Sequence, residues 1–224
     1  MATTVDIRAV DSPFNSIVPN YNYGSINIIR IGTGGRKSLL RYDLSGIASD
    51  KICTAATFKF TNQIDVPAEM NFYVYEIAAA NGDWVEGTGN ASAQNGSPCW
   101  NKKVYNTTDW AGSAGLSTAG TDYVNTALAT KTLTTASKNT DLVEFTVNAS
   151  GLAILQGWFG DASNAGFLLL SDHASSYHVF HSKESTTAGY RPILSVTYDD
   201  PVTGNLLKVN FNAQMQNLSG NMRG

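Results

Sequence analysis

Charged residues are scarce in this chain. They make up 15% of its 224 residues, and the formal net charge is only -3. An average globular protein has roughly 25% charged residues. Because sequence-independent binding of nucleic acid depends on many Lys and Arg side chains that displace counterions, we expect no nucleic-acid partner.

Long apolar runs are missing as well. The longest, at 167–170, is far shorter than the roughly 20 residues of a membrane-spanning helix, so we expect no membrane insertion. The segment 1–10 contains Asp6 and Arg8 and has neither the basic start nor the apolar stretch of a signal peptide. These features predict synthesis in the cytosol without a signal peptide.

Cysteine is almost absent. Cys53 and Cys99 are far apart and have no Cys-x-x-Cys spacing, so we expect two free thiols rather than a zinc site or a disulfide framework. What the chain does have is a core-forming composition, with 42% apolar and 10% aromatic residues. We expect one domain at 1–199, with long polar loops at about 88–140, and a C-terminal extension at 200–224.

Apolar and polar residues alternate along most of the chain, a pattern typical of half-buried strands. Val5, Ile7 and Ala9 alternate with polar residues before a predicted turn at 11–13. Further strands are predicted around 39–44, 58–60, 72–77, 143–147, 167–170, 177–182 and 193–198. Clusters of Gly, Asn, Ser and Asp separate them. The predicted fold class is all-β, an antiparallel jelly-roll β-sandwich.

One segment has helical spacing. Leu152, Leu155 and Trp158 lie three residues apart within 149–158, and Ser150 is available as an N-cap. This predicts one short helix that bridges two strands and covers the core.

Several short sequence elements occur in a fixed order along residues 5–198. They are Asn22, Tyr23 and Gly24; Arg36 and the run 38–45; Trp84, Glu86 and Gly87; Trp100 and Asn101; Phe145, Thr146 and Val147; Trp158; the run 164–169; Phe180, Ser182 and Glu184; Arg191 and Pro192; and the run 194–198. In this order they resemble the DNRLRE family of extracellular β-sandwich modules, some of which are classed as carbohydrate-binding modules. The resemblance implies a jelly-roll module of a surface or secreted protein, with polysaccharide binding in some members and no catalytic residues.

Five of the charged residues lie in these matched elements, among apolar strand residues. We expect them to pair across strands and fix the strand register, which is a structural role rather than a catalytic one. They are Arg41, Asp43, Glu86, Glu184 and Arg191.

Candidate catalytic and metal-binding groups are few. In a strand at 177–182, His178 and His181 point to opposite faces and cannot share a metal ion, and His173 lies in a turn. Asp83 and Glu86 flank Trp84, a pattern compatible with glycoside hydrolysis, but Glu86 belongs to the family resemblance, so we predict no enzyme. No cofactor is predicted. Asp199 and Asp200 form the best acidic cluster for a structural calcium ion, without a fixed ligand spacing.

Exposed aromatic rings can stack on sugars, because they offer an apolar face with a polar edge. Trp110 lies in the long polar loop region and is the first candidate, with Tyr105 and Tyr123 nearby in sequence. Trp84, Trp100 and Trp158 fall on the family elements, and we expect them to anchor the core or the loops.

The extension has a strand pattern of its own. The apolar residues Leu207, Val209, Phe211, Ala213 and Met215 alternate with polar ones. Such a strand needs a sheet edge, either in its own domain or in a neighbouring subunit.

Together these features predict a non-enzymatic structural subunit of a larger assembly that docks through its C-terminal strand. A phage virion surface protein, as capsid decoration or as a tail or fibre component, fits best, located on the virion or another extracellular particle. The expected partners are other protein subunits, copies of the same chain included. The alternative is a polysaccharide-binding module that binds surface glycans.

Overall fold

The computed structural model describes residues 1–161 and 164–201. Strands dominate it. In chain order the elements are β1 (Thr3–Phe14), β2 (Tyr21–Asn22), β3 (Ile28–Gly32), β4 (Lys37–Tyr42), β5 (Ile52–Thr61), β6 (Met70–Glu76), β7 (Ser92–Ala93), β8 (Lys102–Val104), β9 (Thr108–Asp109), β10 (Ala129–Leu133), β11 (Leu142–Thr146), α1 (Ala149–Gly157), β12 (Phe167–Ser171), β13 (Tyr177–His181) and β14 (Ile193–Asp199), with 3-10 turns at Ala79–Asn81 and Ala188–Tyr190.

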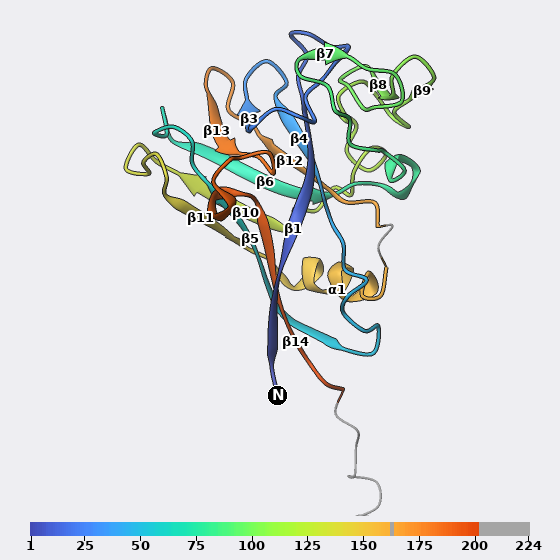
Figure 1. Cartoon of the computed structure of the whole chain (residues 1–224), viewed down its shortest axis with the longest axis vertical. Coiled ribbons are helices and arrows are strands. Elements are labelled where there is room, and N and C mark those ends of the chain that lie inside the picture. Colours follow the sequence, from blue (N-terminus) through green and yellow to red (C-terminus); the bar gives the residue numbers. More distant parts are fainter. Residues whose placement is uncertain (162–163, 202–224) are drawn as a thin grey trace, which may run out of the picture.

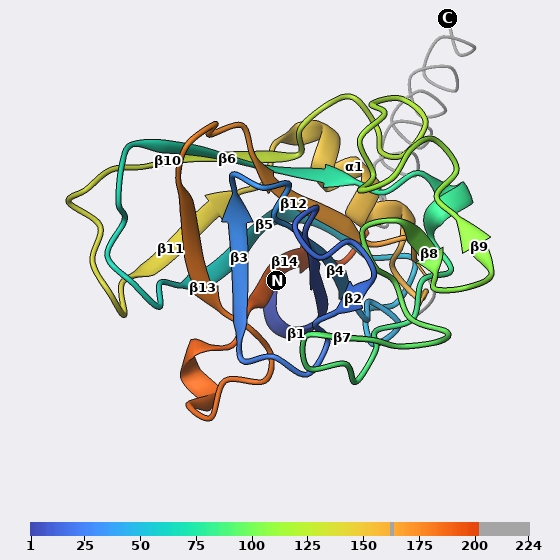
Figure 2. The same cartoon turned by 90° about the horizontal axis from the view of Figure 1, so that it is seen from above.

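The main sheet has the strand order β10-β6-β12-β4-β1-β14-β5-β11, and its pairs are antiparallel. The sheet folds over, so that its two outermost strands, β10 and β11, come into contact. The ribbon of β3 and β13 lies across one opening of the folded sheet (Figure 2). The predicted all-β antiparallel sandwich is confirmed.

Strand β1 belongs to both halves of the sandwich (Figure 1). It pairs with β14 up to Arg8 and with β4 from Ala9 onwards. The predicted turn at 11–13 is therefore wrong, because these residues continue the strand opposite β4. Pairing with β4 and burial of Phe14 keep the turn-prone sequence extended.

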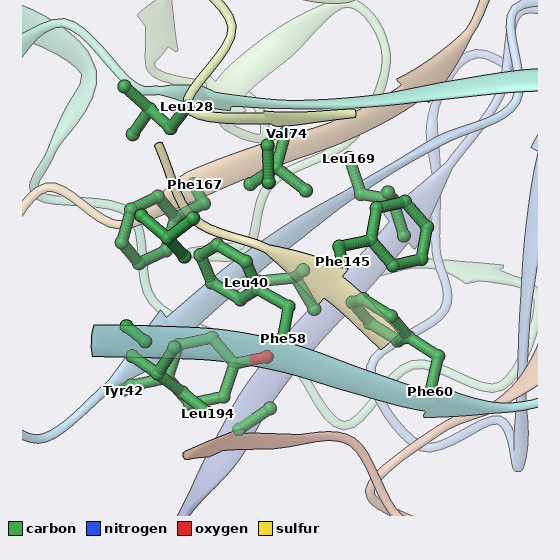
Figure 3. Close-up of a cluster of buried hydrophobic side chains, with 14 of the residues drawn as sticks. Leu40, Tyr42, Phe58, Phe60, Val74, Leu128, Phe145, Phe167, Leu169 and Leu194 are labelled. Carbon is green, nitrogen blue, oxygen red and sulfur yellow. The ribbon is translucent and has the colours of Figure 1, made fainter. Parts of the chain in front are cut away.

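The main core lies between the two halves of the sheet. Aromatic rings from different strands meet there edge to face, as Phe58 and Phe167 do at 5.0 Å and Phe60 and Phe145 at 5.3 Å between ring centroids. Figure 3 shows these rings packed with Leu40 and other aliphatic side chains from neighbouring strands. The inward-facing apolar side chains of β4, β5, β6 and β11 thus fill this space, as the alternation in the sequence predicts.

The short helix is confirmed as α1, but its predicted N-cap is wrong. The side chain of Asn148, not Ser150, accepts a hydrogen bond from the backbone N–H of Gly151 at 3.0 Å. Gln156 joins the helix to β5, because its Oε1 accepts from the backbone N–H of Cys53 at 2.6 Å. Among the described residues, no helix is long and apolar enough to cross a membrane.

A second, smaller core lies outside the main sheet. Leu39 and Leu168 point away from the main core and are covered by the loop region that follows β6, which contributes Trp84 and Trp110. Buried Asp122 organises this region: its Oδ1 accepts from the backbone N–H of Gly112 at 2.8 Å, and its Oδ2 accepts from further loop amides. The predicted loop region 88–140 contains β7, β8, β9 and β10.

Both ends of the described chain lie at one end of the molecule. The Met1 amino group is 3.8 Å from Asp199 Oδ1. The strands β7, β8 and β9 lie at the opposite end, at the top of Figure 1. The predicted C-terminal strand with Leu207, Val209, Phe211 and Met215 lies outside the described residues.

Candidate functional site

Trp110, the first candidate for a sugar platform, is buried. Its ring is 4% exposed and packs in the second core, and its Nε1 donates to the carbonyl oxygens of Cys99 at 3.1 Å and Trp100 at 3.0 Å. The expectation of an exposed ring is therefore wrong. A large ring in a polar loop gains more by covering the apolar outer face of the sheet than by facing water.

The other tryptophans are anchors, as expected. Trp84 is fully buried and donates from Nε1 to the carbonyl oxygen of Ala165 at 3.0 Å. Trp100 packs against the second core and Trp158 against the main core. Tyr105 is half-buried.

Tyr123 belongs to a group of three tyrosines that we call the tyrosine face: Tyr73, Tyr75 and Tyr123. All three are half-buried. The rings of Tyr73 and Tyr75 are stacked, with centroids 6.2 Å apart at 29°, and the ring of Tyr123 lies 4.8 Å from that of Tyr75. Alternation places Tyr73 and Tyr75 on the outer face of β6, opposite buried Phe72 and Val74.

Polar groups surround the tyrosine face. Tyr73 donates its hydroxyl to Asp172 Oδ2 at 2.8 Å, and this hydrogen bond is the main reason that the Tyr73 pKa is raised. Nearby on the outer face, Thr132 Oγ1 donates to Asn71 Oδ1 at 2.7 Å. The sequence held a signal for this surface that the search for loop aromatics missed, namely two tyrosines on one face of a predicted strand.

The five predicted structural charges do not act alike. Arg41 stacks on the ring of Trp84, with Cζ 4.4 Å from the centroid, and donates to the carbonyl oxygen of Gly82. Asp43 is exposed and accepts only locally, from the backbone N–H of Ser45. For these two residues, the prediction of cross-strand ion pairs is wrong, because the partners that the fold brings near are a ring and backbone groups.

Glu86 does link distant segments. Its Oε1 accepts from the backbone N–H of Asp11 at 3.1 Å, and its Oε2 lies 3.0 Å from Lys183 Nζ. Glu184 pairs with its own neighbour Lys183 at 2.6 Å. Arg191 donates from Nε to the carbonyl oxygen of Ser185, six residues away. Of the five, Glu86 is therefore the one that forms the expected ion pair between distant segments.

A fourth residue, Asp11, lies with Glu86, Lys183 and Glu184, and the sequence did not predict it as a site residue. We call Asp11, Glu86, Lys183 and Glu184 the carboxylate cluster. Asp11 is fully buried; its Oδ2 accepts from the backbone N–H of Lys183 at 2.7 Å, while its Oδ1 has no hydrogen-bond partner among the described residues. Burial, with smaller contributions from the two glutamates, raises the Asp11 pKa to about 8. A polar residue in a predicted turn gave no signal of this burial.

The pKa shifts within the carboxylate cluster have different causes. Burial raises the pKa of Glu86, although Lys183 opposes this. Burial lowers the pKa of Lys183, but its hydrogen bonds to Glu184 and Glu86 outweigh this, so the pKa is raised. An open polar cleft of about 600 Å³ borders the cluster and is lined by Arg8, Ala9, Ser25, Lys183, Glu184 and Arg191.

The acid pair proposed for glycoside hydrolysis does not form one site. Asp83 is exposed and pairs with Lys103 Nζ at 2.7 Å. Glu86 instead belongs to the carboxylate cluster, and Trp84 between them is buried. Asp83 and Glu86 therefore do not form a pair of carboxylates that could flank the glycosidic bond of a bound sugar.

The candidate metal ligands are also separate. His178 is buried, with its Nε2 2.9 Å from Asn62 Oδ1, and burial lowers its pKa to about 4. His181 lies on the other face of β13 and stacks near Tyr190. Across residues 1–161 and 164–201, no group of three or more His, Cys, Asp or Glu is arranged to hold a metal ion.

Asp199 and Asp200, the predicted calcium ligands, both face positively charged groups of the protein itself. Asp199 faces the Met1 amino group at 3.8 Å, and Asp200 faces Lys51 Nζ at 2.6 Å. His173, the third histidine, accepts from the backbone N–H of Ser176 at its Nδ1. Cys53 and Cys99 are free thiols, as predicted.

No protein-family model matches the chain, and no curated protein matches it either. The resemblance to the DNRLRE family therefore stays a prediction from the sequence elements.

Proposed function

We propose that this protein is a non-enzymatic structural subunit of a larger assembly, of the kind that decorates a phage virion or forms part of its tail or fibres. The observation that carries the proposal is the arrangement of the two ends of the molecule. The chain leaves β14 beside its own first residue, and the loops with β7, β8 and β9 lie at the far end. Attachment through residues 200–224 would leave the loop end facing outward.

The completeness of the sandwich supports this proposal. Among the described residues, the fully buried side chains of both cores lie between Ala9 and Val196, with Val5, Ile7 and Tyr198 partly buried against them. The strand-like alternation of 207–216 suits a segment that pairs with a partner.

The proposal is tested by light scattering on the full chain and on a chain that ends at Pro201. We expect the full chain to form a defined oligomer or to bind an assembly, and the shortened chain to be a folded monomer with the same thermal transition. Equal monomeric masses for the two chains over a wide concentration range, together with no binding of the full chain to an assembly, would contradict the proposal.

A second candidate function is glycan binding, and the tyrosine face is the observation that favours it. Its rings offer apolar faces for sugar stacking, and Asp172 and Asn71 beside them offer hydrogen-bonding groups. Affinity electrophoresis against a panel of polysaccharides tests this function. A ligand that is found should lose binding about tenfold in Tyr75→Ala, equivalent to about 1.4 kcal/mol, and should keep it in the control Tyr105→Ala.

A further inference from the structure

The first half of β1 has an open edge. From Thr3 to Arg8, β1 pairs with β14 on one side only, and β4 begins to pair on the other side at Ala9. The backbone N–H of Ala9 donates to the carbonyl oxygen of Pro192, on the β14 side. Because strand residues alternate, the backbone groups of Thr4, Asp6 and Arg8 point to the opposite side. No strand among the described residues pairs with them there.

The second half of β1 shows how this protein covers an edge. Asp11 points its backbone N–H to the β14 side, beyond the end of that strand, and Glu86 Oε1 accepts it. The side chain of Glu86 thus takes the place of a neighbouring strand. Nothing comparable covers Thr4, Asp6 and Arg8 in the described part of the chain. An uncovered edge is a template for pairing with a further strand.

The C-terminal segment (202–224) matches this edge in pattern. Val5 and Ile7 are partly buried against the main core, whereas Thr4, Asp6 and Arg8 are exposed. A strand added beside β1 must therefore be apolar on the inner face and polar on the outer face. The run 207–216 alternates in this way, with apolar residues at every odd position.

Strand direction decides between the same chain and a second copy. Asp200 contacts Lys51, which precedes the start of β5, so the chain has already passed the level of Thr3. To pair antiparallel with its own β1, it must first return about seven residues of strand length, roughly 24 Å, and then reverse. That path consumes most of the segment up to Leu207 and part of the alternating run. A second copy has no such constraint, and all pairs between the strands β1 to β14 of the described structure are antiparallel.

We propose that two copies of this chain exchange their C-terminal segments, each pairing antiparallel with the open edge of β1, Thr3–Arg8, in the other copy. The exchange is reciprocal and closed, as a two-fold dimer requires. This inference rests on the proposed function, since it names the partner and the receiving strand for the docking segment.

Complementation between two defective chains tests the exchange. The variant Asp6→Pro removes one outward N–H from the edge, where proline is tolerated, while Asp6→Ala removes the same carboxylate and keeps the N–H. By light scattering, we expect dimers for the full chain and for Asp6→Ala. We expect folded monomers for Asp6→Pro and for the chain ending at Pro201. An equimolar mixture of these last two should form a heterodimer, because one has the segment and the other has the intact edge.

Each other outcome overturns the inference in a distinct way. A monomeric mixture, together with amide-exchange protection of Thr4, Asp6 and Arg8 that the full chain has and the shortened chain lacks, would show pairing within one chain. Dimers of the chain ending at Pro201 would show direct pairing of two β1 edges. An oligomer that needs the segment but survives Asp6→Pro would keep the proposed function and reject this edge. A monomeric full chain that binds no assembly would reject both.

Discussion

Asp11→Asn should stabilise the protein, and the gain should depend on pH. The ordinary pKa of this carboxyl is 3.8, and burial raises it to about 8 in the folded protein. Between these two values the folded chain binds one proton more than the unfolded chain at this site. The contribution of Asp11 to stability is therefore complete below pH 3.8 and is lost progressively as the pH rises to about 8.

The size of the effect follows from the two pKa values. One bound proton changes the free energy of unfolding by about 1.4 kcal/mol per pH unit. Asparagine has the same shape, stays neutral and can still accept from the backbone N–H of Lys183. We therefore expect the difference between Asp11→Asn and the original chain to be small at pH 4, to reach on the order of 4 kcal/mol at pH 7 and to level off above pH 8.

Urea unfolding from pH 4 to pH 9 measures this difference directly. Glu86, Glu184 and Lys183 act electrostatically on Asp11, but they are present in both chains, so their effects largely cancel in the comparison. Asp6→Asn, on the same strand but exposed, controls for the loss of one carboxylate. If the free energies of unfolding of the original chain and Asp11→Asn stay parallel across this range, Asp11 is ionised in the folded protein and the reasoning is refuted.

Three further changes test the fold by thermal or urea unfolding. Asn148→Ala should cost about 1 to 2 kcal/mol, because it removes the N-cap of α1, while Ser150→Ala should be close to neutral; equal costs would contradict the assigned cap. Asp122→Ala should cost roughly 3 to 5 kcal/mol, since three part-buried loop amides lose their acceptor, and limited proteolysis should then cut the loop region first; an unchanged cleavage pattern would contradict its organising role. Arg41→Lys should cost about 1 kcal/mol through the weaker stacking on Trp84, and an unchanged transition would show that the stacking is of no consequence.

The strands with strong alternation were predictable because their pattern is local. In β6, Phe72 and Val74 point inward and Tyr73 and Tyr75 outward, as a period of two requires. The short helix was predictable from the spacing of its apolar residues. Its cap was not, because Asn148 and Ser150 are both good capping residues and the choice depends on where β11 ends.

The candidate sites were less predictable, because burial is not a local property. Trp110 lies in a polar stretch, yet the outer face of the sheet supplies an apolar surface that covers it. Arg41 was expected to find a carboxylate but stacks on Trp84, which lies more than forty residues away in the chain. Such contacts depend on which loop folds over which strand.

The sequence by itself determined the class of the fold, since alternation and turn residues act over a few positions and leave little choice but antiparallel strands. It also determined the faces of each strand, including the outward tyrosines. Only the tertiary structure decided that β1 passes from one half of the sandwich to the other. That crossing buries Asp11 beneath Lys183 and leaves Thr3–Arg8 with an open edge. The physical reason is that strand pairing joins residues far apart in the chain, so burial and free edges are set by partners that no local pattern specifies.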